Sequence, residues 1–362
     1  MTRPTPLARL QDLPPACFAP VMATAIAARA LAEAHVQDLP GILTTLAVAL
    51  HALLLTAFLG KATCHRQALA AELRDPARLF GHYTQVAASG VLAVSLAADR
   101  PLRTAAYALT ITAALTWAAL AVPTLTALRR NAPRTVLRQA DGTWFLATVG
   151  LQSIVTALTS VAATSPALLA SASVLWAAGL LAYASTLSAV IWRLRHHPPG
   201  PDQLTPAYWI TMGAAAISTL AGARLAVCEH RLPRAEQGHQ WLTPALTGAA
   251  TALWCWASLL LPPLLAAGLW RHARHRRRLG YELPLWCIVF PLGMYATATS
   301  RLATAARATP LSRATDLLSR ATGPLAWTAM TAWTAVVAGA LVTVTAAVTA
   351  RSSAPPRRRP AR

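Results

Sequence analysis

Acidic residues are scarce in this sequence. Only 12 of its 362 residues are Asp or Glu, against 32 Lys and Arg, and charged residues of both signs make up 12% of the chain. Soluble globular domains carry about 25% charged residues, so the composition argues against a water-soluble domain. Lysine is almost absent as well, since Lys61 is the single one. The preference for arginine is uniform along the chain, and we interpret it as codon usage rather than selection for bidentate phosphate contacts.

The sequence also lacks the patterns of a metal site, a disulfide framework or an enzyme. Its five cysteines are odd in number and scattered, which predicts neither disulfides nor a metal site. His196 and His197 are adjacent, but no third ligand lies near them in the sequence. The chain contains neither a His-Glu-x-x-His motif nor a Gly-x-Ser-x-Gly elbow. We therefore expect no cofactor, no metal and no enzymatic activity.

Apolar residues dominate instead, at 55% of the chain, and the mean hydropathy is +0.44. Crossing ~30 Å of hydrocarbon takes ~20 helical residues. Ten stretches approach this length, near residues 17–35, 41–60, 83–98, 103–128, 145–163, 167–192, 207–225, 243–269, 285–303 and 324–349. We predict an all-α integral membrane protein with ten transmembrane helices. Residues 1–16 would form a cytoplasmic lead-in, 17–350 the ten-helix transmembrane domain and 351–362 a basic, disordered cytoplasmic tail.

The positive charges predict an orientation. If both termini are cytoplasmic, 22 of the 32 Lys and Arg residues fall in inward segments, as the positive-inside rule requires. The formal charge of +20 therefore marks the edges of spans, and nucleic acid is not expected as a partner. The prediction is a multi-pass protein of the cytoplasmic (inner) membrane, surrounded by lipid bilayer.

A proline lies near the middle of the ninth apolar stretch, next to an aromatic residue. Pro291 removes a backbone donor and crowds the preceding turn, which bends a helix and frees carbonyl groups. At membrane depth, such carbonyls are tolerated only against protein or a water-filled cavity. Phe290 beside the bend could then close a narrow passage, with Pro291 as its hinge. The alternative is a kinked packing helix whose Phe290 contacts a neighbouring helix.

Polar side chains inside spans are expected to face the interior of a bundle. The odd-numbered spans supply the pore-lining candidates Thr24, Gln85, Ser89, Gln152, Thr156, Thr211, Ser218, Tyr295 and Thr297. Hydroxyl and small residues also hold membrane helices together, so packing is the alternative for each. Apart from Glu33, no acidic residue lies inside a predicted span. A pathway of hydroxyl and amide donors without carboxylates suits an anion.

Two ionisable groups within spans allow more than one interpretation. Arg29 and Glu33 are four residues apart, so they can pair locally on one helix face. Alternatively, Arg29 is a cation exposed to a permeation path, where it would attract anions. His51, in the second span, could take up a proton near neutral pH, although a packed neutral side chain is the simpler interpretation.

Several segments resemble a known family. They are residues 14–26 (PPACFAPVMATAI), 75–84 (DPARLFGHYT), 142–153, 206–225 and 290–295 (FPLGMY), in order over nearly the whole chain. On these residues the chain resembles the tellurite-resistance/C4-dicarboxylate transporter family, which includes the slow-type anion channels of plant guard cells. The resemblance implies ten helices arranged as five hairpins, with odd helices around a central pore and even helices outside. It also implies a homotrimer and a phenylalanine gate in the ninth helix, at Phe290.

The expected function is therefore a membrane anion channel or carrier. It would pass small organic or inorganic anions, of the C4-dicarboxylate or tellurite-family type, through a central pore gated by Phe290. Proton-coupled C4-dicarboxylate transport is the alternative within the same class. A membrane sensor without transport and an intramembrane enzyme are the alternatives from other classes.

Overall fold

The computed structural model describes residues 10–130, 132–161, 165–200, 202–232, 242–273, 280–307 and 315–352. Every regular element in these ranges is helical. The predicted tail lies almost entirely outside them, as do the first nine residues of the predicted lead-in. The chain is therefore an all-α protein throughout its described part.

Each of the ten predicted apolar stretches contains a long helix. These helices are α2 (Ala19–Glu33), α3 (Leu39–Cys64), α6 (Tyr83–Leu96), α7 (Arg103–Arg130), α9 (Phe145–Val161), α10 (Pro166–His196), α11 (Ile210–Arg231), α12 (Leu242–Ala273), α13 (Trp286–Ala306) and α14 (Thr315–Ser352). Eight of them are long and apolar enough to cross a membrane. The other two, α2 and α6, have 15 and 14 residues. A helix of 15 residues spans about 22 Å, so ten spans remain a prediction.

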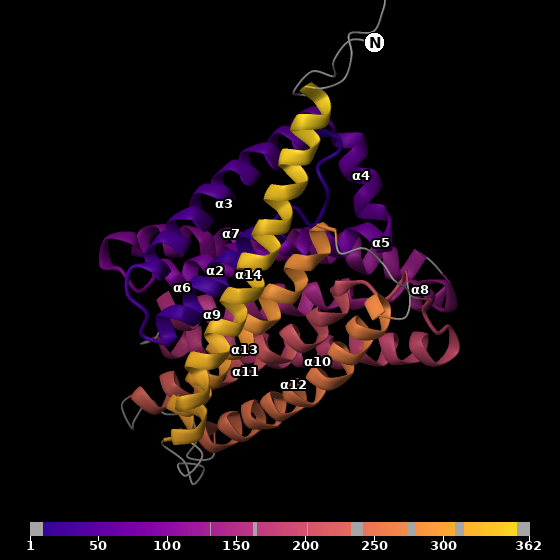
Figure 1. Cartoon of the computed structure of the whole chain (residues 1–362). Coiled ribbons are helices and arrows are strands. Elements are labelled where there is room, and N and C mark those ends of the chain that lie inside the picture. Colours follow the sequence, from indigo (N-terminus) through magenta and orange to yellow (C-terminus); the bar gives the residue numbers. More distant parts are fainter. Residues whose placement is uncertain are drawn as a thin grey trace, which may run out of the picture.

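Short helices connect the long ones. They are α4 (Arg66–Arg74), α5 (Pro76–Leu79), α8 (Pro133–Gln139) and the 3-10 turns η1 (Phe80–His82), η2 (Arg100–Leu102), η3 (Gly142–Trp144), η4 (Pro206–Trp209) and η5 (Leu283–Leu285). An aspartate begins two of them, because the side chains of Asp75 and Asp141 accept the backbone N–H groups of Ala77 and Thr143. Helices α4, α5 and α8 lie together at one end of the bundle, at the right of Figure 1.

The long helices form two concentric rings. Helices α2, α6, α9, α11 and α13 contact one another in this order, and α13 closes the ring on α2; we call them the central ring. Helices α3, α7, α10, α12 and α14 form the peripheral ring, and each packs against two neighbouring central helices. Within their most apolar windows, α9, α11 and α13 are 67–89% buried, whereas the peripheral helices are 6–22% buried.

Hydrogen bonds between the two rings repeat around the bundle. At four places, an indole N–H of a peripheral helix donates a hydrogen bond to the next central helix around the ring. At the fifth place, an imidazole takes the position of the indole. These contacts are Trp117 Nε1 to Ala147 O (3.0 Å), Trp176 Nε1 to Ser218 O (2.9 Å), Trp254 Nε1 to Thr299 Oγ1 (2.9 Å), Trp333 Nε1 to Thr24 Oγ1 (2.9 Å) and His51 Nε2 with Ser89 Oγ (3.4 Å). The structure thus contains a five-fold repeat of contacts that is not visible as a sequence repeat.

Two glycines let the central helices approach closely. A Cβ atom at Gly90 would lie 2.5 Å from Ser153 Oγ, and one at Gly213 would lie 2.9 Å from Pro291 Cγ. Real Cβ atoms do not come this close to other atoms. The contacts of α6 with α9 and of α11 with α13 therefore depend on these glycines.

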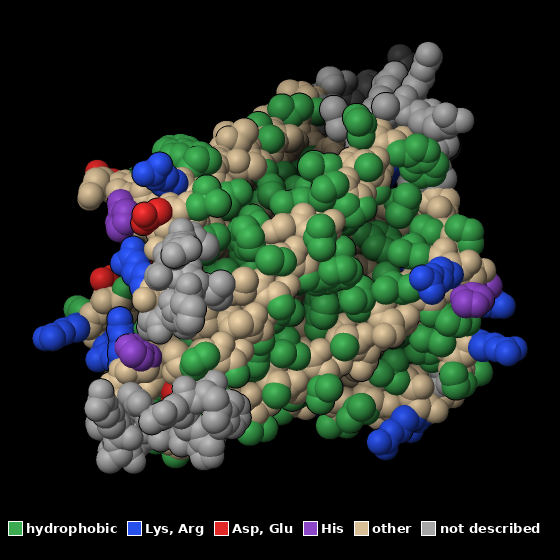
Figure 2. Space-filling view, turned by 90° about the horizontal axis from the view of Figure 1, so that it is seen from below, with side chains coloured by type: hydrophobic (Ala, Val, Ile, Leu, Met, Phe, Trp, Pro, Cys, Tyr) green, Lys and Arg blue, Asp and Glu red, His purple; other side chains and the backbone are tan. Residues whose placement is uncertain are grey.

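The surface of the bundle has an apolar middle. Large apolar side chains of the peripheral ring are exposed, among them Leu181 at 71%, Leu269 at 70% and Val174 at 69%. Figure 2 shows a face whose middle is hydrophobic and whose charged and histidine side chains gather at two opposite ends. This arrangement is what a lipid bilayer requires of a protein that crosses it. The chain is a multi-pass membrane protein.

Candidate functional site

The neighbours of α13 define which of its faces points to the middle of the central ring. A Cβ atom at Gly293 would lie 3.0 Å from Ile26 on α2, whereas Pro291 contacts Gly213 on α11. Tyr295 and Thr299 face the peripheral helix α12, through Ser258 and Trp254. Since successive residues of an α-helix turn by about 100°, the remaining face carries Phe290, Met294, Thr297 and Arg301. This axial face of α13 runs from an aromatic ring to a guanidinium group.

Phe290 lies in the packed interior. Its side chain is 0% exposed, and its Cε1 atom would lie 3.4 Å from a Cβ atom at Gly213. Helix α13 begins at Trp286 and runs through Pro291 to Ala306. Phe290 and Pro291 therefore lie in the first two turns of α13, not at its middle as the sequence suggested. The helix ends at Ala306, three residues beyond the predicted stretch 285–303, which moves its middle away from Phe290.

All nine predicted pore-lining residues are buried: Thr24, Gln85, Ser89, Gln152, Thr156, Thr211, Ser218, Tyr295 and Thr297. The side chains of four of them hydrogen-bond to the peripheral ring, and the backbone carbonyl groups of Ser218 and Thr211 accept hydrogen bonds from Trp176 and Tyr183. Thr24 and Ser89 meet Trp333 and His51 as described above, Gln152 Nε2 donates to Trp176 O at 3.1 Å, and Tyr295 pairs with Ser258 at 2.6 Å. These bonds hold the two rings together. A role in permeation remains a prediction for all nine.

Among the other candidates, bonds within a single helix prevail. Thr156, Ser218 and Thr297 donate to backbone carbonyl groups three or four residues earlier, and Gln85 Nε2 donates to Ser89 Oγ. Such bonds leave the oxygen lone pairs and the amide oxygen for another partner. The oxygen Oε1 of Gln85 has no hydrogen-bond partner among the described residues.

A group of charged residues lies where the central helices α2, α11 and α13 end. Glu33 accepts hydrogen bonds from Arg29 on its own helix and from Arg301 on α13, and Ser300 Oγ donates to it at 2.8 Å. Arg224 on α11 donates to Thr159 and Ser160 on α9. The residues on either side of Arg224 belong to one apolar cluster with Leu302 and Ala303 of α13, so Arg224 lies near the level of Arg301. We call Arg29, Arg224, Arg301 and Glu33 the arginine cluster.

The sequence predicted part of this cluster. The pairing of Arg29 with Glu33 at a separation of four residues is present in the structure. Arg301, which also pairs with Glu33, and the neighbouring Arg224 were not predicted to belong to the cluster. For Arg301 a signal existed, because eleven residues after Phe290 is three helical turns and hence the same face.

A polar cavity of about 610 Å³ opens beside the cluster, between the ends of α2 and α13 and the beginning of α14. Its lining includes Arg29, Glu33, Ser300, Arg301, Arg307 and Arg320. Its size lies within the usual range for small-molecule sites, about 300–1,000 Å³. Basic and hydroxyl groups line it, so it suits a small anion.

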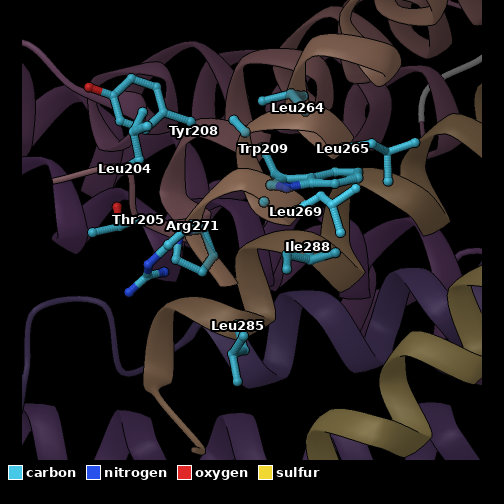
Figure 3. Close-up of a pocket in the computed structure, with 13 residues that line it drawn as sticks. Leu204, Thr205, Tyr208, Trp209, Leu264, Leu265, Leu269, Arg271, Leu285 and Ile288 are labelled. Atoms are coloured by element: carbon cyan, nitrogen blue, oxygen red, sulfur yellow. The ribbon is translucent and has the colours of Figure 1, made fainter. Parts of the chain in front are cut away.

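A second cavity, of about 380 Å³, lies between η4, α12 and the beginning of α13. Figure 3 shows the indole of Trp209 in its middle, between Leu264 and Leu265 on one side and Leu269 and Ile288 on the other. The charged group in its lining is Arg271, which is paired with Glu282 at 3.6 Å. This mostly apolar lining does not suit a hydrated anion.

The opposite end of the bundle contains a buried ion pair. Lys61 Nζ donates to both carboxylate oxygens of Glu72, at 2.9 Å each, and to Leu13 O at 2.6 Å. His82 in η1 lies 3.4 Å from Glu72. Burial, together with the charges of Lys61 and Arg78, lowers the pKa of His82 to about 4, so this imidazole is neutral at pH 7. In the described ranges, no group of three or more His, Cys, Asp or Glu residues could hold a metal ion.

Two comparisons relate this sequence to known proteins. The sequence pattern of the family described as "Voltage-dependent anion channel" matches residues 12–352. An uncharacterized membrane protein, recorded from two strains of Mycobacterium tuberculosis, is 43% identical over 125 residues. That match covers 34% of this chain and 60% of the length of the relative.

Proposed function

Because the chain belongs to the voltage-dependent anion channel family, we propose that it carries small anions across the membrane through the middle of the central ring. The five central helices would form the wall of the pore, and all ten long helices would cross the membrane as five hairpins. Phe290 would close the pore, with Pro291 as its hinge. The passage of C4-dicarboxylates or tellurite, the inner-membrane location, cytoplasmic termini and a homotrimer belong to the same proposal.

The observation that carries the proposal is the axial face of α13. Phe290, Thr297 and Arg301 share that face, while the other faces of the helix contact α2, α11 and α12. An apolar ring near one end of a narrow path can hold it closed by excluding water. A guanidinium group near the other end attracts anions and repels cations.

The distribution of acidic residues supports an anion rather than a cation. Within the central helices, Glu33 and Glu229 lie in last turns, and no Asp or Glu lies between the two ends. Glu33 is neutralised by Arg29 and Arg301. Hydroxyl groups such as those of Thr156, Ser218 and Thr297 can replace part of an anion's hydration shell without holding it tightly.

Anion flux into vesicles containing the variant Phe290→Ala tests the gate. Removing the ring opens the constriction, so we expect flux to rise at least tenfold over that of the wild type. Phe145→Ala is the matched control, because Phe145 is equally buried but packs against Tyr183 of the peripheral ring, with 5.2 Å between ring centroids. Equal flux through folded Phe290→Ala and wild-type protein would remove Phe290 from this role.

A pH gradient separates the channel from the proton-coupled alternative. Flux through a channel follows the electrochemical gradient of the anion alone, so a proton gradient imposed across the vesicle membrane leaves it unchanged. His51 is buried and lies between Phe18 and Ser89, which favours a packing role over proton transfer. Accumulation of the anion driven by the proton gradient would instead establish coupled transport.

A further inference from the structure

Three arginines lie near the ends of three central helices, and the neighbours of Arg224 belong to one apolar cluster with Leu302 and Ala303, the residues that follow Arg301. Arg29 lies on α2, Arg224 on α11 and Arg301 on α13, each within the last two turns. Glu33 accepts hydrogen bonds from Arg29 and Arg301, whereas Arg224 is held by Thr159 and Ser160 on α9. Three guanidinium groups and one carboxylate leave a net charge of two positive units. Like charges brought together in a partly buried place repel one another, so the cluster favours a further negative charge.

Donor groups of the cluster remain available. Arg29 Nε is buried and has no hydrogen-bond partner among the described residues. Arg224 donates hydrogen bonds to the hydroxyl groups of Thr159 and Ser160, which are neutral and do not balance its charge. Guanidinium groups pair best with planar or tetrahedral oxyanions, to which they donate two parallel hydrogen bonds.

Solvent can reach three of the four residues of the cluster. The side chains of Arg29, Arg301 and Glu33 are 16%, 31% and 9% exposed, and all three line the polar cavity of about 610 Å³. Arg307 and Arg320 lie in the same lining and raise the local concentration of anions at the entrance. An anion that enters this cavity meets Arg29 and Arg301 while Glu33 still occupies them.

We propose that Arg29, Arg224 and Arg301 form an oxyanion-binding site at this mouth of the central ring, and that Glu33 is its built-in competitor. The carboxylate of Glu33 holds the guanidinium groups in place when the site is empty. An arriving carboxylate or sulfate displaces it and takes over its hydrogen bonds. The role of this site in permeation rests on the proposed function, but binding itself requires no transport.

Calorimetric titration of the full-length protein in detergent tests the site. Sodium sulfate and sodium succinate serve as separate probes of tetrahedral and planar oxyanions, with sodium chloride as a spherical control. We expect Glu33→Gln to bind sulfate or succinate at least tenfold more tightly than the wild type, because the competitor is gone. Glu33→Asp should act in the same direction, because its shorter side chain reaches the two arginines less well.

The variant Arg224→Gln should weaken binding of the same probe at least tenfold. Arg103→Gln is the matched control, since Arg103 is an exposed arginine at the start of α7, and it should bind like the wild type. Unchanged or weaker binding by folded Glu33→Gln or Glu33→Asp would overturn the competitor role. Unchanged binding by folded Arg224→Gln would overturn the site.

Vesicle flux separates this inference from the proposed function. Binding that follows the expected order, with no flux through wild-type protein or Phe290→Ala, would keep the site and reject the pore. Flux that persists while none of the three probe anions binds would keep the pore and reject the site.

Discussion

Replacing Lys61 by Met removes the ammonium group that neutralises Glu72. Lys61 and Glu72 are 1% and 3% exposed, so the remaining carboxylate would stay shielded from water. Arg78 lies 3.8 Å away but is 57% exposed, and exposed pairs contribute little. His82 lies 3.4 Å from Glu72; removing Lys61 also removes one of the charges that lower the pKa of His82, but burial, the largest cause, still opposes its protonation.

The expected loss follows from these contacts. Breaking a buried ion pair by removing one partner costs about 3–5 kcal/mol, and we expect Lys61→Met to lower the free energy of unfolding by this amount. Replacing both partners by apolar residues is often close to neutral. The double variant Lys61→Met with Glu72→Leu should therefore be more stable than Lys61→Met alone, with a coupling energy of at least ~2 kcal/mol.

Lys61→Arg keeps the positive charge but changes the shape of the charged group. It therefore tests whether this position requires an ammonium group or only a cation. The ammonium group fits between Leu13 O and both oxygens of Glu72. A guanidinium group is larger, and overpacking typically costs ~1–3 kcal/mol. Reversible denaturant unfolding in detergent measures these three variants, together with Glu72→Leu alone, which the coupling energy requires. A loss below ~1 kcal/mol for Lys61→Met, or additive effects in the double variant, would refute the reasoning.

Two further predictions concern the rings and the loop before α9. Trp333→Phe removes the indole bond to Thr24 and should lower the free energy of unfolding by about 1 kcal/mol. The same change at Trp327, which is 52% exposed on the same helix, should have little effect, and equal losses would contradict the role of the bond. Burial raises the pKa of Asp141, so the native state retains the proton to higher pH than the unfolded state does, and stability falls as pH rises through that interval. Asp141→Asn should flatten this part of the stability profile in unfolding measured against pH, and an unchanged slope would contradict the assignment.

The sequence alone determined that the chain is helical and belongs in a membrane. A backbone in hydrocarbon must satisfy its hydrogen bonds internally, so long apolar stretches with few charges leave almost no alternative to helices. All ten stretches do contain a helix. The resemblance in residues such as 14–26 and 290–295 also identified the family correctly.

Boundaries were less accurate. The last helix begins at Thr315, nine residues before the predicted start of that span, and Pro324 lies inside it. A proline at a helix start and one within a helix look alike in a sequence, because only the surrounding contacts decide between them. The boundaries of α13 also differ from the prediction. Phe290 lies in its first two turns rather than near its middle.

Only the tertiary structure decided which helices form the centre. Helices α11 and α12 are both apolar enough to span a membrane, yet their apolar windows are 89% and 6% buried. Lipid tails are as apolar as a leucine side chain, so an apolar face can meet lipid or protein at similar free energy. The familiar contrast between an apolar inside and a polar outside is therefore missing.

The arginine cluster shows the same limit for the candidate site. The sequence placed Arg29 beside Glu33 because both lie on one helix, four residues apart. Arg224 and Arg301 come from helices hundreds of residues further along the chain. From the sequence, arginines at the edges of spans indicated only the orientation of the chain in the membrane. The packing of α13 against α2 brings Arg301 to Arg29 and Glu33.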